Sequence, residues 1–82
     1  MEIDDKIINA EKIAGLKQST KMVEAGRAKV AYAAHDAQEH VAAPFMDLCK
    51  TAKVEVVRTY SMKELGEICR VEVPTAFMVI VS

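Results

Sequence analysis

The segment from Gly15 to Lys21 brings together a glycine, two lysines and a glutamine where a helical pattern begins. The first N–H groups of a helix have no partner inside the helix, and they carry a partial positive charge. Lys17 and Lys21 are four residues apart and therefore share one face of the expected helix. Unpaired donors beside two cations favour an anion, of which phosphate is the obvious candidate. Gln18 adds a planar amide that can hydrogen-bond the edge of a base.

The charge of the chain is unevenly distributed around this segment. Between Lys12 and Lys29 there are five basic residues and one acidic residue, a local charge of +4, whereas the remaining six basic and eleven acidic residues give −5. One basic region on an otherwise acidic chain fits a single defined nucleic-acid site better than non-specific coating. The alternative, in which these charges only solvate a helix face, stays open on the charge pattern alone.

The aromatic content narrows the kind of nucleic acid. The chain has two tyrosines and two phenylalanines, and most of them fall at expected core positions. Proteins that bind single strands usually stack bases on exposed aromatic side chains. A structured RNA that is read in a groove is therefore the better match.

A second cluster, His35 to His40, contains residues that can bind a metal. Asp36 and His40 are four residues apart and could hold an ion for a small metal-dependent hydrolase, but their spacing matches no zinc signature. A cap on the following helix is the better interpretation of Asp36.

Nucleophile elbows and glycine-rich phosphate loops are absent from the sequence, so we expect neither an enzyme nor a cofactor. Cys49 and Cys69 fit reduced core thiols.

The loop from Arg70 to Pro74 places Val71 and Val73 beside a proline that stiffens the backbone. If exposed, these valines form a small apolar wedge that can pack against an unstacked base. The alternative is that both side chains fold into the edge of the core, and the residues alone do not separate the two.

Helix and strand patterns alternate along the chain. The expected elements are a helix capped by Asp4 or Asp5, a strand at 12–15, a helix at 17–25, a strand at 29–34, a helix from a capping box at 36–39 that Pro44 bends or begins, a strand at 54–60, a helix from a capping box at 61–64, and a strand at 76–81. This order predicts the α/β class, with a mixed and mainly parallel sheet between helical layers.

Length and composition indicate one ordered domain spanning residues 1–82. Its longest apolar runs are too short for a membrane span, and the acidic start lacks the basic region of a signal peptide. We therefore expect a cytoplasmic protein that has no membrane partner. We also expect it to be a monomer, although the residues do not determine the oligomeric state.

Four segments in order resemble the L7Ae family of kink-turn-binding ribosomal proteins, in particular its short bacterial members. They are Gly15-Leu16-Lys17-Gln18-Ser19-Thr20-Lys21, Ala34-His35-Asp36-Ala37, Ser61-Met62-Lys63-Glu64-Leu65-Gly66 and Val71-Glu72-Val73-Pro74. The resemblance covers nearly the whole chain. It implies a three-layer α/β/α sandwich with a four-stranded mixed sheet, and an RNA partner that contains a kink-turn, a sharply bent helix–internal loop–helix with tandem sheared G·A pairs. The ribosome is one assembly that it suggests.

The resemblance also implies a role for each site residue. Lys17, Gln18 and Lys21 would lie in the major groove of the bend, and Gly15 would let the backbone approach closely. The wedge, which consists of Val71, Glu72 and Val73, would cover a flipped-out nucleotide, and His35 and Asp36 would border the same surface.

This chain departs from the family pattern at four positions. Gln18 stands where many members have Glu, Lys17 stands in place of Asn, Arg70 replaces a usual glycine, and Glu39 replaces a proline. A lysine in place of an amide shifts recognition toward phosphate and salt dependence. The alternative function is a protein-interaction or ribonucleoprotein scaffold module with little RNA affinity of its own.

Overall fold

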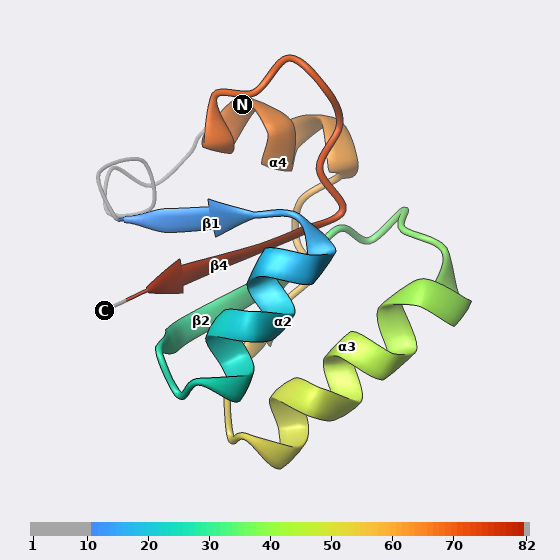
Figure 1. Ribbon diagram of the computed structural model, residues 1–82. Helices are drawn as coiled ribbons and strands as arrows, with labels where there is room; N and C mark the ends of the chain where they lie inside the picture. Colours follow the sequence, from blue (N-terminus) through green and yellow to red (C-terminus); the bar gives the residue numbers. More distant parts are fainter. Residues whose placement is uncertain (1–10, 82) are drawn as a thin grey trace.

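The computed structural model describes residues 11–81, and Figure 1 shows how their elements are arranged. The helix expected after Asp4 or Asp5 lies outside the described residues. The elements alternate in the order β1 (Lys12–Ala14), α2 (Leu16–Glu24), β2 (Ala28–Ala33), α3 (Glu39–Thr51), β3 (Val56–Val57), α4 (Met62–Cys69) and β4 (Phe77–Val81). The strand expected at 54–60 is confined to two residues of β3.

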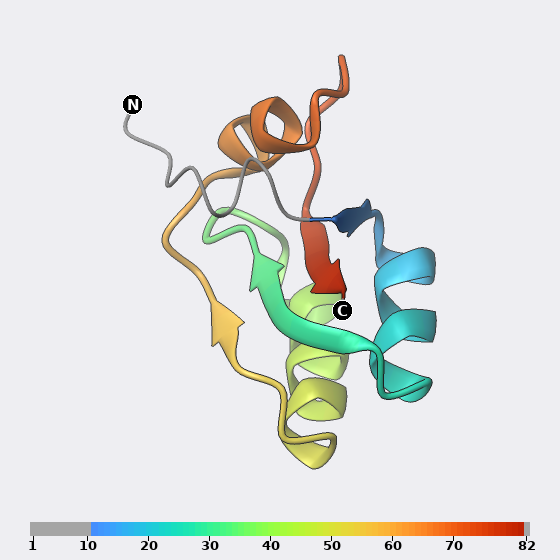
Figure 2. The same cartoon turned by 90° about the vertical axis from the view of Figure 1, so that its left-hand side faces the viewer.

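The four strands form one mixed sheet in the order β1-β4-β2-β3, which confirms the predicted four-stranded mixed sheet. The expectation that it is mainly parallel is wrong, because β4 is antiparallel to both β1 and β2 and only β2 and β3 are parallel (Figure 2). The cause lies after α4. The loop at 70–76 carries the chain back to the start of that helix, where Thr75 N–H donates to Met62 O, so β4 enters the sheet from that same end.

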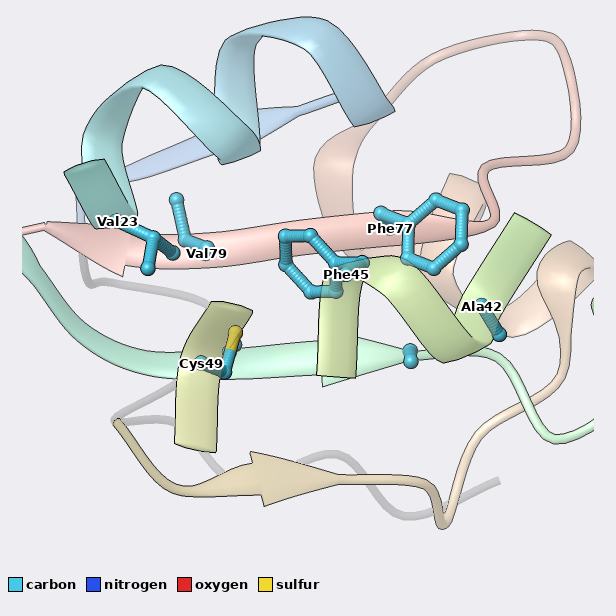
Figure 3. Close-up of a cluster of buried hydrophobic side chains, with 8 residues drawn as sticks. Val23, Ala42, Phe45, Cys49, Phe77 and Val79 are labelled. Carbon is cyan, nitrogen blue, oxygen red and sulfur yellow. The ribbon is translucent and has the colours of Figure 1, made fainter. Parts of the chain in front are cut away.

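Helices cover both faces of the sheet, which confirms the three-layer sandwich. On one face, α2 and α3 pack over a core that contains Val23, Phe45 and Phe77, with the two phenylalanine rings 4.9 Å apart between centroids (Figure 3). On the other face, α4 packs Leu65 and Ile68 in a second core. The apolar run of β4 is buried from both sides as predicted, because its successive side chains alternate between the two cores.

One of the two predicted capping boxes is confirmed and the other is wrong. Ser61 Oγ accepts from Glu64 N–H at 3.1 Å, and Glu64 Oε1 accepts from Ser61 N–H at 3.0 Å. Asp36, by contrast, does not cap α3, which begins at Glu39 after Gln38 and has no side-chain cap. Asp36 instead accepts from Met62 N–H at 2.9 Å and caps α4. Pro44 lies inside α3 and not at its start.

Both cysteines are unpaired, as the sequence predicts, with Cys49 buried and Cys69 half-buried. Burial raises the pKa of both thiols, and the charge of Lys12 partly offsets this for Cys69. Both therefore remain protonated and weakly nucleophilic near neutral pH. Among residues 11–81, no helix has the length and apolar character needed to cross a membrane.

Two helix ends place a cation in the left-handed conformation. Arg70 follows α4 with φ 59°, and Lys53 follows α3 with φ 60°. This conformation strains a residue that has a Cβ, and glycine adopts it freely. Arg70 and Lys53 thus follow their helices in a conformation that favours glycine.

We expect Arg70→Gly and Lys53→Gly each to raise the free energy of unfolding by about 0.5–1 kcal/mol, because each relieves the strain at a helix C-terminus. Urea denaturation followed by circular dichroism measures the change. A lower midpoint for both variants would contradict the prediction.

Candidate nucleic-acid interface

Gly15 sets the angle at which the chain leaves β1 and enters α2. Its dihedral angles, φ 99° and ψ 148°, belong to a region that essentially only glycine occupies. A Cβ at this position would meet no atom within 4 Å, so the requirement comes from the backbone and not from a lack of space. The Gly15 N–H donates to Phe77 O at 2.9 Å and fastens the start of α2 to the start of β4.

The first turn of α2 presents donors and cations to solvent. Ser19 N–H bonds back to Gly15 O, whereas within residues 11–81 no acceptor bonds the N–H groups of Leu16, Lys17 or Gln18. The side chains of Lys17, Gln18 and Lys21 are exposed. On the opposite side of the helix, Ser19 and Val23 are buried, and Ser19 Oγ contacts Ile13 O at 3.5 Å. The helix therefore turns its polar face outward, as an anion-binding element requires.

Backbone hydrogen bonds draw four chain segments to one end of the sheet, where α2 begins (Figure 1). These bonds are Gly15 N–H to Phe77 O, Ala34 N–H to Ala76 O, His35 N–H to Tyr60 O and Thr75 N–H to Met62 O. The β2–α3 loop and the α4–β4 loop are thus joined to the same end of the sheet as the first turn of α2. The predicted site residues come from these two loops and from the start of α2.

The wedge is exposed on its loop. Val71 is 40% exposed and Val73 is 66% exposed, and Glu72 between them also lies at the surface. The alternative in which both valines fold into the core is therefore wrong. Large apolar side chains held in solvent, on a loop joined to the same end of the sheet as the start of α2, are available to a partner.

His35 and Asp36 are exposed on the β2–α3 loop. Because the Asp36 carboxylate caps α4, its first role in the structure is to join this loop to that helix. Within the part of the chain that the structure describes, no three His, Cys, Asp or Glu side chains are grouped as metal ligands.

Arg58 is a positioning residue that the sequence does not reveal. Its Nη2 donates to Ala34 O and its Nη1 to Glu39 Oε1, both at 3.1 Å. Arg58 therefore binds both ends of the β2–α3 loop. Both partners lie about twenty residues away in the sequence, and no local pattern indicates them.

Comparisons with known proteins agree with this architecture. The model of the ribosomal protein L7Ae/L30e/S12e/Gadd45 family matches residues 5–82. An RNA-binding protein of Geobacillus sp. (strain WCH70) is 32% identical over 78 residues, which cover 94% of this chain and 95% of that protein. An RNA-binding protein of Caldanaerobacter subterraneus subsp. tengcongensis is 33% identical over 66 residues, 80% of each chain.

Solved structures share the fold. A 15.5 kD RNA-binding protein of Giardia lamblia superposes with a TM-score of 0.80 at 28% identity, covering 92% of this chain and 62% of that one. A protein of unknown function from Bacillus halodurans superposes with a TM-score of 0.79 at 18% identity, covering 87% of this chain and 71% of that one. The second likeness concerns the fold alone.

Proposed function

The chain belongs to the ribosomal protein L7Ae/L30e/S12e/Gadd45 family, and from this membership we propose that it is a non-catalytic RNA-binding protein that recognises and stabilises kink-turns. The names of its relatives, which are RNA-binding proteins, support the first part of this proposal. The kink-turn is the more specific part, and it rests on the resemblance of the four sequence segments described above.

The observation that carries the proposal is the first turn of α2. Three backbone donors without a partner in the described residues lie beside exposed Lys17, Gln18 and Lys21. In the major groove of a bent duplex, the lysines would contact phosphates and guanine O6 or N7. Gln18 would offer one donor and one acceptor to a base, whereas the glutamate found in many relatives would offer a carboxylate to two guanine donors.

The wedge supports recognition of the loop nucleotide. Val71 and Val73 project into solvent from a loop that is hydrogen-bonded to the start of α4. An unstacked base exposes an apolar face to water, and packing that face against the valines removes both surfaces from water. Only a bent RNA would present its groove to α2 and an extruded base to the wedge at the same time.

Contact with both the first turn of α2 and the wedge gives the bent RNA a higher affinity for the protein than the extended RNA has. A ligand with such a difference shifts the conformational equilibrium toward the form that it binds. The protein would therefore act as a clamp for RNA folding. We further propose that it works as a monomer in the cytoplasm, with the ribosome as one candidate assembly.

A binding comparison tests the proposal. We expect an RNA with an intact kink-turn to bind at least about ten-fold more tightly than the same RNA with its G·A pairs replaced by Watson–Crick pairs, a difference of about 1.4 kcal/mol. Gel-shift titrations at fixed salt measure both dissociation constants. Equal affinities would refute kink-turn specificity, and no binding to either RNA at low salt would favour the scaffold module.

A further inference from the structure

Gly66 lies in the middle of α4, directly against the α4–β4 loop. A Cβ placed on this buried residue would lie 2.6 Å from Val73 O and 3.5 Å from Pro74 Cα. A carbon atom cannot approach a carbonyl oxygen that closely, and the oxygen belongs to the backbone, so only movement of the loop would make room. Glycine inside a helix costs about 1 kcal/mol relative to alanine. The close contact gives a physical reason for a glycine here.

The loop is also hydrogen-bonded to α4 near both of its ends. Val71 N–H donates to Gly66 O at 3.0 Å, and Thr75 N–H donates to Met62 O at 3.0 Å. The first bond belongs to the C-terminal cap of α4, and the second joins the end of the loop to the first turn of the helix. The loop therefore leaves the C-terminal end of α4 and returns to its start, with the carbonyl of Val73 directly against Gly66 on the way.

This arrangement determines where the wedge stands. With the Val73 carbonyl against the helix, the side chains of Val71 and Val73 remain 40% and 66% exposed. Beside this contact, an open hollow of about 350 Å³ lies at the surface, and Gly66, Val71 and Val73 are among the residues that line it. A methyl group at position 66 would push the loop away from α4 and change how far the side chains of Val71 and Val73 project from the helix.

We infer that Gly66 is a positioning residue for RNA recognition. Because it has no side chain, the loop can lie close to α4, and the wedge is then placed where it can contact the extruded base. The inference rests on the proposed function and adds a residue that itself touches no RNA.

The test is the variant Gly66→Ala, measured alone and together with Val71→Ala/Val73→Ala. We expect Gly66→Ala to weaken binding of a kink-turn RNA about ten-fold while the protein stays folded, because part of the packing of two valines is lost. In the Val71→Ala/Val73→Ala background the same substitution should change affinity less than two-fold, since the side chains that it displaces are gone. The control is Gly26→Ala, at the residue that follows α2 and Ala25. Its added methyl group meets no atom within 4 Å, although its φ of 72° strains an alanine, so it should lower stability and leave the RNA affinity unchanged.

The outcomes separate this inference from the proposed function. If Val71→Ala/Val73→Ala weakens binding and Gly66→Ala does not, Gly66 has no positioning role and the proposed function stands. If Gly66→Ala weakens binding equally in both backgrounds, it acts elsewhere than through the wedge, and the inference is overturned. If Val71→Ala/Val73→Ala binds like the unchanged protein, the wedge contact itself is refuted.

Hydrogen exchange of the unchanged protein gives a second test that does not depend on any variant folding. The amides of Val71 and Thr75 should be protected from exchange, because both are bonded to α4. Exchange of both amides at the rate of unstructured peptides would mean that the loop does not rest on the helix, and would overturn the inference.

Discussion

Replacing both Lys17 and Lys21 with alanine is expected to weaken binding of a kink-turn RNA about 100-fold near physiological salt. Each exposed lysine would lose one charge-assisted contact with phosphate, worth about 1.5 kcal/mol, or roughly ten-fold in affinity. Each lost contact also removes one released counterion. The slope of log K against log salt should therefore become about two units less steep. Gel-shift titrations at several salt concentrations measure both quantities.

The matched control is Lys50→Ala/Lys53→Ala, which removes the same charge from exposed lysines. Lys50 lies in the last turn of α3 and Lys53 just after that helix. In Figure 1 this end of α3 lies far from the start of α2. The control should keep its affinity within about three-fold, since long-range attraction is screened beyond about 8 Å at this salt. A salt slope that falls equally in both double variants would show that net charge alone, and not the α2 site, drives binding.

Phe45→Ala is expected to lower the free energy of unfolding by about 3–5 kcal/mol. The Phe45 side chain is 2% exposed and packs against Phe77, which is also 2% exposed. Its truncation leaves a cavity between α3 and β4, the strand whose first residue holds Gly15. The free energy of unfolding of native proteins is typically about 5–15 kcal/mol, so the variant should lose a large part of its stability.

Urea denaturation with a circular dichroism readout measures this effect. Leu16→Ala is the control, because Leu16 is also a large apolar residue but is 41% exposed, and its truncation should cost less than about 1 kcal/mol. Similar midpoints for the two variants would mean that the Phe45–Phe77 contact is not part of a well-packed core.

The local elements of the fold can be predicted from the sequence because their causes are local. The capping box at Ser61 forms between residues three positions apart. The residues of β4 are all apolar, and this unbroken run by itself predicts a strand that is covered on both faces. Asp36 follows the same pattern, but its prediction fails because the N–H that its side chain caps belongs to Met62, 26 positions along the chain. A short-range pattern does not show which distant donor a side chain will meet.

The arrangement of the site is predicted less completely. The sequence identifies Lys17, Gln18 and Lys21 as one face of α2, because helical spacing alone fixes their common direction. It does not reveal that Gly66 and Arg58 support the neighbouring loops, since Gly66 lies against the backbone carbonyl of Val73 and Arg58 donates to that of Ala34. A carbonyl group is the same in every residue, so its position follows only from the fold.

The strand order has a consequence for biosynthesis. β4 lies between β1 and β2, and it is the last of the four strands to be translated. Until it leaves the ribosome, β1 has no neighbour in the sheet, and β2 can pair only with β3. Closing the register between Lys12 and Ile80 must then bring together nearly the two ends of the described chain, which is a slow, non-local step. Nascent chains that stop short of β4 should therefore be sensitive to protease, and resistance should appear only when that strand emerges.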